Sequence, residues 1–546
     1  GPWDPRRIIG TVPVLEDGSA AFKIPAYVPI ALQPLDKDGN ALQIMRSWIT
    51  AQPGESVSCI GCHEPQNSTG TTNPRSMASQ IDPVEITPFY GETRGFGFER
   101  EIQPILDRYC VECHQPDSAK IAEMIKNGEV SEDVLKTTKR EHETFDDAIL
   151  PDYRKSDPKC VLDNGNYIAS KSPISNSYYQ LRRYVRTVTK ESQMPTHPAY
   201  DFHADATLLV QILQRGHFGV ELDPESWDKI VTWIDLNCPY NGSWGEMIRD
   251  NPALVKSQYS RREELRKLYA PSSDQLDDNP NDPTVVNPEP NSPLRVQFSS
   301  EIKDEPEAAF EKPNGSMVSV PLSNDVRMDF VKMPGSKISV GKFEVTNEQY
   351  KVFDPTFDTG IEYGDFIQFS PGERGWLLSR AKQPVARVSY RDAQAFCAWL
   401  SEKTGDEYRL PTYAEWRAFA DEESLQADYA ASENLADSTY AYISPFGWTG
   451  RVETLPAWRP VDWNVDDNSR VSAPVGSYKK NAYGLYDVLG NVAEWTSGER
   501  VDTRKIVNVE TGEKVSENST TKRIAAGGSW TTPARFATSA TVRAFP

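Results

Sequence analysis

Two short cysteine motifs carry the strongest chemical signal in this 546-residue sequence. Each motif has two cysteines separated by two residues and followed at once by a histidine: Cys59, Cys62 and His63 in the first, and Cys110, Cys113 and His114 in the second. Two thiols at this spacing can form thioethers with the two vinyl groups of one porphyrin, and the adjacent imidazole can bind the iron. The motifs therefore predict two covalently bound haems c, with His63 and His114 as the proximal iron ligands.

Two other chemistries use the same cysteine spacing. Four thiolates can build one tetrahedral zinc site, and a single pair can form a redox-active disulfide. Zinc does not require a histidine after each second cysteine, yet two of the six histidines in the chain occupy those positions. The gap between the two pairs is also long for a compact zinc ribbon. Haem is therefore favoured, and zinc and a disulfide remain as alternatives.

The second axial position of each iron has few candidate ligands in the sequence. They are Met194, His142, His197, His203 and His217. His217 follows a glycine at the end of an expected amphipathic helix, and His197 lies in the proline-flanked loop QMPTHP. We expect His217 to be the distal ligand of the haem attached at Cys110 and Cys113, with His197 as the competing candidate. A filled sixth position favours electron transfer, whereas an open one favours binding of a small molecule.

Three cysteines lie outside these motifs. Covalent haem attachment implies an oxidising compartment outside the cytoplasm, the periplasm or its equivalent, where disulfides persist. Cys160 and Cys238 are expected in the same domain and could pair there. Cys397 lies in the helical segment AQAFCAWL, where a cysteine typically acts as a small buried apolar residue.

The pattern of residues along the chain predicts a multidomain protein. Short apolar runs separated by the turn signals EDGS and DKDGN indicate a β-rich domain over residues 1–95, which carries the first haem. Amphipathic segments such as SYYQLRRYVR and ESWDKIVTWIDLNC indicate a mainly α, cytochrome c-like domain over residues 96–268, which carries the second. Residues 269–315 are rich in Pro, Asn and Asp and are expected to be a linker. Residues 316–546 are expected to form a separate α+β domain.

The charge balance limits the classes of partner. The chain has 79 acidic and 59 basic residues and a net charge of -20. Nucleic acids and anionic membranes are disfavoured because binding them needs clustered Lys and Arg, whereas a basic redox partner protein would be attracted. No apolar run approaches the roughly 18 residues of a membrane span. The opening residues GPWDPRRIIG are not a signal peptide, so we expect a processed or trimmed chain, or part of a longer one.

The first 245 residues resemble the hydrazine synthase alpha-subunit family. The resemblance rests on GTVPVLEDGSAAFKIPA, MRSWITAQPGESVSCIGCHE, the CVECH motif, RGHFGVEL and WIDLNCPYNG. It implies two c-type haems in this region. In hydrazine synthase a tyrosine shortly after the first motif acts at the catalytic haem, whereas here His63 is followed by EPQNSTGTTN. The resemblance therefore does not extend to hydrazine synthesis.

Residues 316–546 resemble the formylglycine-generating enzyme, or sulfatase-modifying factor, family. The matching segments are FVKMPG, KFEVTNEQY, PVARVSYRDAQAFCAWL, YRLPTYAEWRAFA, APVGSYKKNAYGLYDVLGNVAEWTSG and AAGGSW. The resemblance implies a C-type-lectin-like α+β fold. Family members bind copper through two cysteines just after the GGS motif, and here Thr532 and Ala537 occupy those positions. Because Cu(I) is a soft ion that needs thiolates, we expect a domain without that activity, which acts as a scaffold or binds a glycan or protein.

The same resemblance implies calcium sites built from side-chain and main-chain oxygens, the hard ligands that calcium prefers. One site matches Asn434, Leu435, Asp467 and Ser469, and the other matches Leu489, Gly490, Val492 and Glu494. The alternative is that Asn491, Glu494 and Trp495 stabilise a turn without a metal.

Three functions are compatible with these features. The favoured one is a dihaem c-type cytochrome that transfers electrons outside the cytoplasm, with the C-terminal domain as a binding or scaffold module. The second is a haem oxidoreductase acting on a small molecule such as a nitrogen species or a peroxide. The third is an interaction protein in which the lectin-like domain is primary. The coordination of the two irons separates the first from the second.

Overall fold

The computed structural model divides the chain into two compact units. Unit 1 comprises residues 1–188, 194–297 and 506–516, and unit 2 comprises residues 189–193, 298–505 and 517–546. The structure describes residues 5–43, 48–59, 75–138, 147–148, 150–156, 174–185, 204–248, 251–269, 292–303, 305–363, 375–420, 433–437, 439–440, 465–534, 537–540 and 542–545.

Extended segments that pair at single points form the described part of residues 5–95. Isolated bridges join Arg7 to Gly95, Thr11 to Thr87 and Ile30 to Ile49, and a short 3-10 helix, η1, spans Met77–Gln80. The expected β-rich segment is therefore extended, but its described residues form bridges instead of continuous ladders. Frequent turn residues explain this, because each apolar run is too short to support a long ladder.

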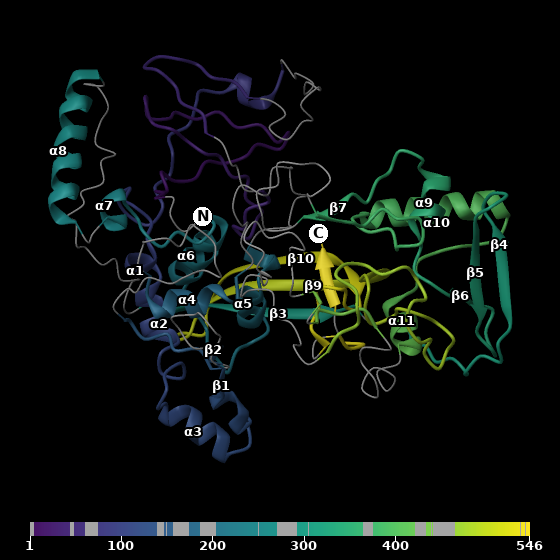
Figure 1. Cartoon of the computed structure of the whole chain (residues 1–546). Helices are drawn as coiled ribbons and strands as arrows, with labels where there is room; N and C mark the ends of the chain where they lie inside the picture. The colour runs from purple at the N-terminus through teal and green to yellow at the C-terminus, as the bar shows by residue number, and fades with distance from the viewer. Residues whose placement is uncertain are drawn as a thin grey trace, which may run out of the picture. The chain divides into compact units, whose positions relative to one another are not determined.

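Short helices dominate the rest of unit 1. They are α1 (Phe98–Glu101), α2 (Gln103–Tyr109), α3 (Ala119–Lys126), η2 (Glu132–Leu135), α4 (Asn176–Arg182), η3 (Ala204–Ala206), α5 (Leu208–Gln214), α6 (Pro224–Asp235), α7 (Trp244–Met247) and α8 (Pro252–Tyr269). Strands β1 (Thr137–Thr138) and β2 (Asp147–Ala148) pair antiparallel. The helices expected around SYYQLRRYVR, LLVQILQ and ESWDKIVTWID are confirmed (Figure 1).

An aromatic cluster fills the core between α1, α4 and α6. The rings of Phe98 and Tyr178 meet edge to face at 5.1 Å, and the ring of Trp233 lies 5.5 Å from Phe98. Tyr240 contacts both Phe98 and Tyr178. These side chains are almost fully buried. Aromatic pairs of this kind contribute about 0.5–1.5 kcal/mol beyond the area that they bury.

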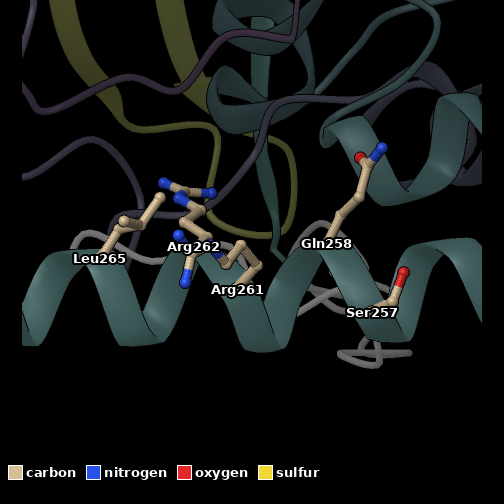
Figure 2. A pocket seen from close by; sticks show the side chains of 5 residues that line it. All are labelled: Ser257, Gln258, Arg261, Arg262 and Leu265. Atoms are coloured by element: carbon tan, nitrogen blue, oxygen red, sulfur yellow. The ribbon is translucent and has the colours of Figure 1, made fainter.

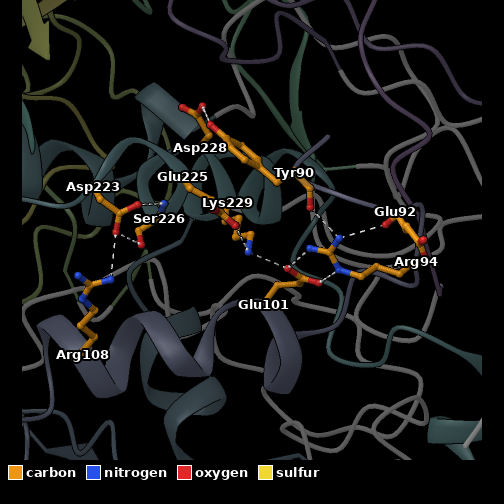
Figure 3. A network of polar contacts seen from close by, with 10 residues as sticks. All are labelled: Tyr90, Glu92, Arg94, Glu101, Arg108, Asp223, Glu225, Ser226, Asp228 and Lys229. Carbon is orange, nitrogen blue, oxygen red and sulfur yellow. Dashed lines mark hydrogen bonds and ion pairs between the residues drawn. The ribbon is translucent and has the colours of Figure 1, made fainter. Parts of the chain in front are cut away.

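Buried charges join α1 to α6 in the same unit (Figure 3). Both oxygens of Glu101 bind the Arg94 guanidinium, at 2.7 and 2.9 Å. Lys229 Nζ lies 3.2 Å from Glu101 and 2.6 Å from Glu225. The side chains of Glu101 and Lys229 are both fully buried. Because an unpaired buried charge costs about 3–5 kcal/mol, this network fixes the position of α1 against α6.

Helix α8 is exposed along most of its length. Ser257, Gln258, Arg261, Arg262 and Leu265 line an open hollow on one side of it (Figure 2). Arg261 forms an ion pair with Glu264 at 2.7 Å. Among the described residues, neither α8 nor any other helix is long and apolar enough to cross a membrane.

Unit 2 combines several sheets with the helices α9 (Asn347–Phe353), α10 (Tyr390–Thr404) and α11 (Tyr413–Phe419), of which α10 is the longest. Its strands are β3 (Leu294–Ile302), β4 (Met317–Pro321), β5 (Arg327–Lys332), β6 (Ser339–Gly341), β7 (Ile361–Tyr363), β8 (Gly375–Leu377), β9 (Glu494–Asn508), β10 (Lys514–Ala526) and β11 (Val542–Phe545). Sheets form in the orders β11-β10-β9-β3, β4-β5-β6 and β7-β8. The first residues of β3 and the end of the β9-β10 hairpin are grouped with unit 1. Strand β3 lies within the range expected to be a linker.

Capping boxes begin the helices α9, α10 and α11. Thr346, Ser389 and Thr412 each accept a backbone N–H from the first turn, and a side chain of that turn binds back to the cap. Helices α9 and α10 pack together (Figure 1), and Tyr350 of α9 stacks on Phe396 of α10. The α+β character expected for this region is confirmed.

Candidate functional site

The second cysteine motif forms a tight turn at the end of α2. Cys110 is the C-cap residue of this helix, and its amide donates to the carbonyl of Leu106. The amides of Cys113 and His114 both donate back to the carbonyl oxygen of Cys110, at 3.1 and 2.9 Å. One turn of backbone therefore holds both thiols and the imidazole, as covalent attachment of one porphyrin requires.

Both thiols of this motif are held in the neutral form. Burial, followed by the neighbouring Cys113 and Asp107, raises the pKa of Cys110 to about 12. Burial also raises the pKa of Cys113. Cysteines that exchange disulfides need a lowered thiol pKa, which nearby basic groups or a helix N-terminus provide. The environment of Cys110 therefore argues against a redox-active disulfide at this motif.

The imidazole of His114 is oriented by two neighbours. Its Nδ1 lies 3.2 Å from the carbonyl oxygen of Pro151, and the ring of Tyr153 stacks on it at 4.6 Å. Burial, and then the nearby His217, lowers the pKa of His114 to about 4. A neutral imidazole that donates Nδ1–H to a carbonyl leaves the lone pair of Nε2 available for a metal. The residues around His114 thus fit a proximal iron ligand.

His217 lies opposite His114, although the two are 103 positions apart in the sequence. Their ring centroids are 5.9 Å apart and their planes differ by 25°. The chain turns at this point because Gly216 and Gly219 have φ of 85° and 76°. Burial lowers the pKa of His217, which favours the neutral ligand form. Because a metal–imidazole bond is about 2 Å long, a centroid separation of 5.9 Å leaves room for one metal ion between the two imidazoles.

The first cysteine motif and most of the scattered candidate ligands of unit 1 lie mainly outside the described residues. Cys59 is exposed, but Cys62, His63, Cys160, Met194, His142, His197 and His203 lie outside the described residues. Cys238 is a buried free thiol, and its possible partner Cys160 is among the residues that the structure does not describe. Cys397 is also free and is half-buried on α10, a more open setting than the buried one expected.

The first calcium position expected in unit 2 contains a pair of acids. Asp467 Oδ2 accepts the amide of Leu435 at 2.8 Å, and its own amide donates to Asp437. Burial, and then the charge of Asp437, raises the pKa of Asp467 to about 7. The Oδ1 atom of Asn434 is buried without a hydrogen-bond partner among the described residues. The Ser469 hydroxyl lies 2.7 Å from that of Tyr478.

The second calcium position contains four carboxyl groups, from Glu344, Glu433, Asp487 and Glu494. Burial raises the pKa of all four, and the charge of Asp487 raises that of the other three further. The pKa of Asp487 reaches about 6, and that of Glu494 about 7. Oδ1 of Asp487 and Oε2 of Glu433 are buried without a hydrogen-bond partner among the described residues. The cluster therefore needs a proton or a cation to balance its charge.

The structure adds acids that the sequence reasoning missed. Asp437 faces Asp467 at the first position, and Asp487 and Glu433 belong to the second. Leu489, in contrast, uses its carbonyl to accept the amide of Gly528 at 3.0 Å. No local pattern marks these acids, because burial and partners far along the chain define the cluster. Within the described ranges, no group of three or more His, Cys, Asp or Glu is arranged to hold a metal, so calcium here would need main-chain oxygens as well.

The loop after the GGS motif has no thiols at the two positions where the resemblance expects them. Thr532 Oγ1 accepts the amide of Ser529 at 3.0 Å and lies 3.3 Å from the Arg543 guanidinium. Ala537 is fully buried in the apolar core. A hydroxyl and a methyl group cannot replace two thiolates as ligands of a soft ion.

Comparison with known proteins confirms the resemblance of the C-terminal region. Residues 317–545 match the model of the sulfatase-modifying factor enzyme 1-like domain. The formylglycine-generating enzyme of Streptomyces coelicolor is 34% identical over 135 residues, which cover 23% of this chain and 35% of that protein. The inactive C-alpha-formylglycine-generating enzyme 2 of Bos taurus is 32% identical over 129 residues, which cover 23% of this chain and 37% of that protein. The chain thus spans about a third of the length of these relatives.

A comparison of structures matches PvdO from Pseudomonas aeruginosa, with 20% identity and a TM-score of 0.22, over 46% of this chain and 87% of that one. Residues 1–64, which include the first cysteine motif, match the model of the hydrazine synthase alpha subunit middle domain. Residues 317–545 are therefore similar to the sulfatase-modifying factor enzyme 1-like domain family, and residues 1–64 to the hydrazine synthase alpha subunit family.

Proposed function

We propose that this chain is a dihaem c-type cytochrome that transfers electrons outside the cytoplasm. The observation that supports this best is the pair of neutral imidazoles of His114 and His217, with ring centroids 5.9 Å apart beside the thiols of the second motif. An iron with an imidazole on each side has no free position for a substrate, which favours electron transfer over catalysis.

The residues of unit 1 have distinct parts in this proposal. Cys110 and Cys113 would hold a haem covalently, and His114 and His217 would bind its two axial faces. A bound haem supplies a metal that accepts and donates one electron. The carbonyl of Pro151 keeps the Nδ1 proton of His114 in place, and Tyr153 covers one face of its ring. Buried, neutral imidazoles favour a stable coordination geometry.

The proposal extends to the first motif and to the partner. Cys59, Cys62 and His63 would hold the other haem, with His197 as a candidate distal ligand there or at the second haem. Thioether attachment favours an extracytoplasmic compartment. The net charge of -20 favours a basic redox partner protein, whose approach would be faster at low ionic strength.

The C-terminal unit has a supporting part in this proposal. It would bind a glycan or protein ligand or act as a scaffold, without the copper chemistry of active formylglycine-generating enzymes, because Thr532 and Ala537 supply no thiolate. We also propose calcium at its buried acids. Asn434, Leu435, Asp467 and Ser469 would hold one ion. Leu489, Gly490, Val492 and Glu494, together with Asp487, would hold the other. The Leu489 carbonyl accepts the amide of Gly528, and its second lone pair remains for the ion.

Haem content tests the proposal directly. A pyridine haemochrome assay on the purified chain is expected to give two haems c per chain. The double variant Cys110→Ala, Cys113→Ala is expected to retain one, because each motif attaches its own porphyrin. The double variant Cys59→Ala, Cys62→Ala is the matched control and should lose the other. Zinc in place of haem in the parent chain would contradict the proposal.

Activity on a sulfatase-type peptide tests the part assigned to the C-terminal unit. The full chain, supplied with copper and oxygen, is expected not to convert the cysteine of such a peptide to formylglycine, because both thiolate ligands are replaced. Mass spectrometry of the peptide measures the conversion, with an active formylglycine-generating enzyme as the positive control. Conversion that depends on copper would show that other residues hold the ion.

A further inference from the structure

A hydrogen bond between Tyr109 and Asp223 joins the two turns that carry the facing imidazoles. Tyr109 is the last residue of α2 and directly precedes Cys110. Its hydroxyl donates to Asp223 Oδ2 at 2.7 Å, and the amide of Asp223 donates back to the same hydroxyl oxygen at 3.3 Å. One phenol thus makes two contacts with a single residue of another helix.

Asp223 is itself held firmly at the start of α6. It is the N-cap residue, and its carboxylate accepts the amide of Ser226 at 2.9 Å and the Ser226 hydroxyl at 2.6 Å. Arg108 lies 3.8 Å from the same carboxylate (Figure 3). The side chain of Asp223 is 1% exposed. A buried carboxylate with this many donors has little freedom to move.

Tyr109 and Asp223 each lie only a few residues from one of the two imidazoles. His114 follows Tyr109 by five residues, and His217 precedes Asp223 by six. The hydrogen bond therefore closes a short path between the two imidazoles that runs through the end of α2 and the start of α6. Loss of this hydrogen bond would let the turn that carries His217 move more freely relative to the turn of the cysteine motif.

We propose that Tyr109 is a positioning residue that holds the His217 turn against the turn of the second cysteine motif, and so keeps the sixth position of that haem filled. This inference rests on the proposed haem function. Tyr109 acts on the His217 turn through Asp223. Loss of the phenol hydroxyl would keep both histidine side chains in the protein. It would loosen the turn that carries His217.

The test is Tyr109→Phe in the full, haem-loaded chain. The variant should retain two haems, because both cysteine motifs are intact. Its absorption spectrum should show an increased high-spin fraction, and the carbon monoxide affinity of the ferrous protein should rise about two- to tenfold, the range expected for loss of one hydrogen bond. Asp223→Asn, which keeps a good N-cap residue, should change the spectrum in the same direction.

The matched control is Tyr178→Phe. This change also removes one buried tyrosine hydroxyl from unit 1, since Tyr178 donates to the carbonyl of Cys238 at 2.8 Å. It should lower the unfolding temperature without changing spin state or carbon monoxide affinity. A Tyr109→Phe protein that loses stability but has the parent's spectrum and carbon monoxide affinity would overturn the positioning role and leave the haem proposal intact. A parent chain without haem would overturn both.

Discussion

With two haems bound as proposed, replacement of His217 by alanine is expected to convert one of them from low spin to high spin. The imidazole of His217 lies 5.9 Å, ring centroid to ring centroid, from that of His114. Loss of a strong nitrogen donor weakens the ligand field and favours the reduced iron, so the reduction potential of that haem should rise. Absorption and electron paramagnetic resonance spectra would report the spin state, and a redox titration the potential. Carbon monoxide should bind this haem in the variant without having to displace a ligand.

The neighbouring residue supplies the control for this change. Phe218 is 56% exposed and follows His217 in the same glycine-flanked turn. Its ring contacts that of His217 edge to face at 5.1 Å. Phe218→Ala removes this contact but keeps the imidazole, so it should change the spectrum and the carbon monoxide affinity far less than His217→Ala. If His217→Ala leaves both unchanged, His217 is not an iron ligand, and His197→Ala becomes the next variant to measure.

Local sequence signals predicted much of unit 1 and unit 2 correctly. The segment AQAFCAWL is helical as expected, within α10. Ser389 caps one end of this helix, and Gly405 ends the other in the left-handed conformation. Asp223, a residue type favoured at helix N-termini, caps α6. The turn at Gly216 was also expected. These features depend on a few adjacent residues, which a sequence displays directly.

The buried acids of unit 2 were predicted less completely, for a physical reason. The raised pKa of Glu433 or Asp437 depends on burial and on charges brought close by the fold. Glu433 and Asp487 are 54 positions apart in the sequence, and nothing local shows that they meet. The opposition of His114 and His217 was expected because only six histidines compete for the role. Acidic residues are far too numerous for the same reasoning to select a pair.

Calcium is expected to stabilise unit 2 through the cluster of Asp487 and its neighbouring acids. A cation that binds only the folded state stabilises it by about 2.7 kcal/mol at one hundred times its dissociation constant. For a domain of 150–250 residues this corresponds to a rise of roughly 5–10 °C in the unfolding temperature. Calorimetry of the full chain in millimolar calcium and in excess chelator would measure the difference. The transition of unit 2 should move, and the haem spectrum should not change.

The variant Asp487→Asn tests whether Asp487 is one of the calcium ligands. In the chelator it should unfold at or above the temperature of the parent, because it removes a charge that repels Glu344, Glu433 and Glu494. In calcium it should unfold below the parent, because a ligand is lost. Asp392→Asn is the control: it weakens the capping box of α10 and should lower the unfolding temperature equally in both conditions. An Asp487→Asn protein that is destabilised equally with and without calcium would show that Asp487 has only a structural role.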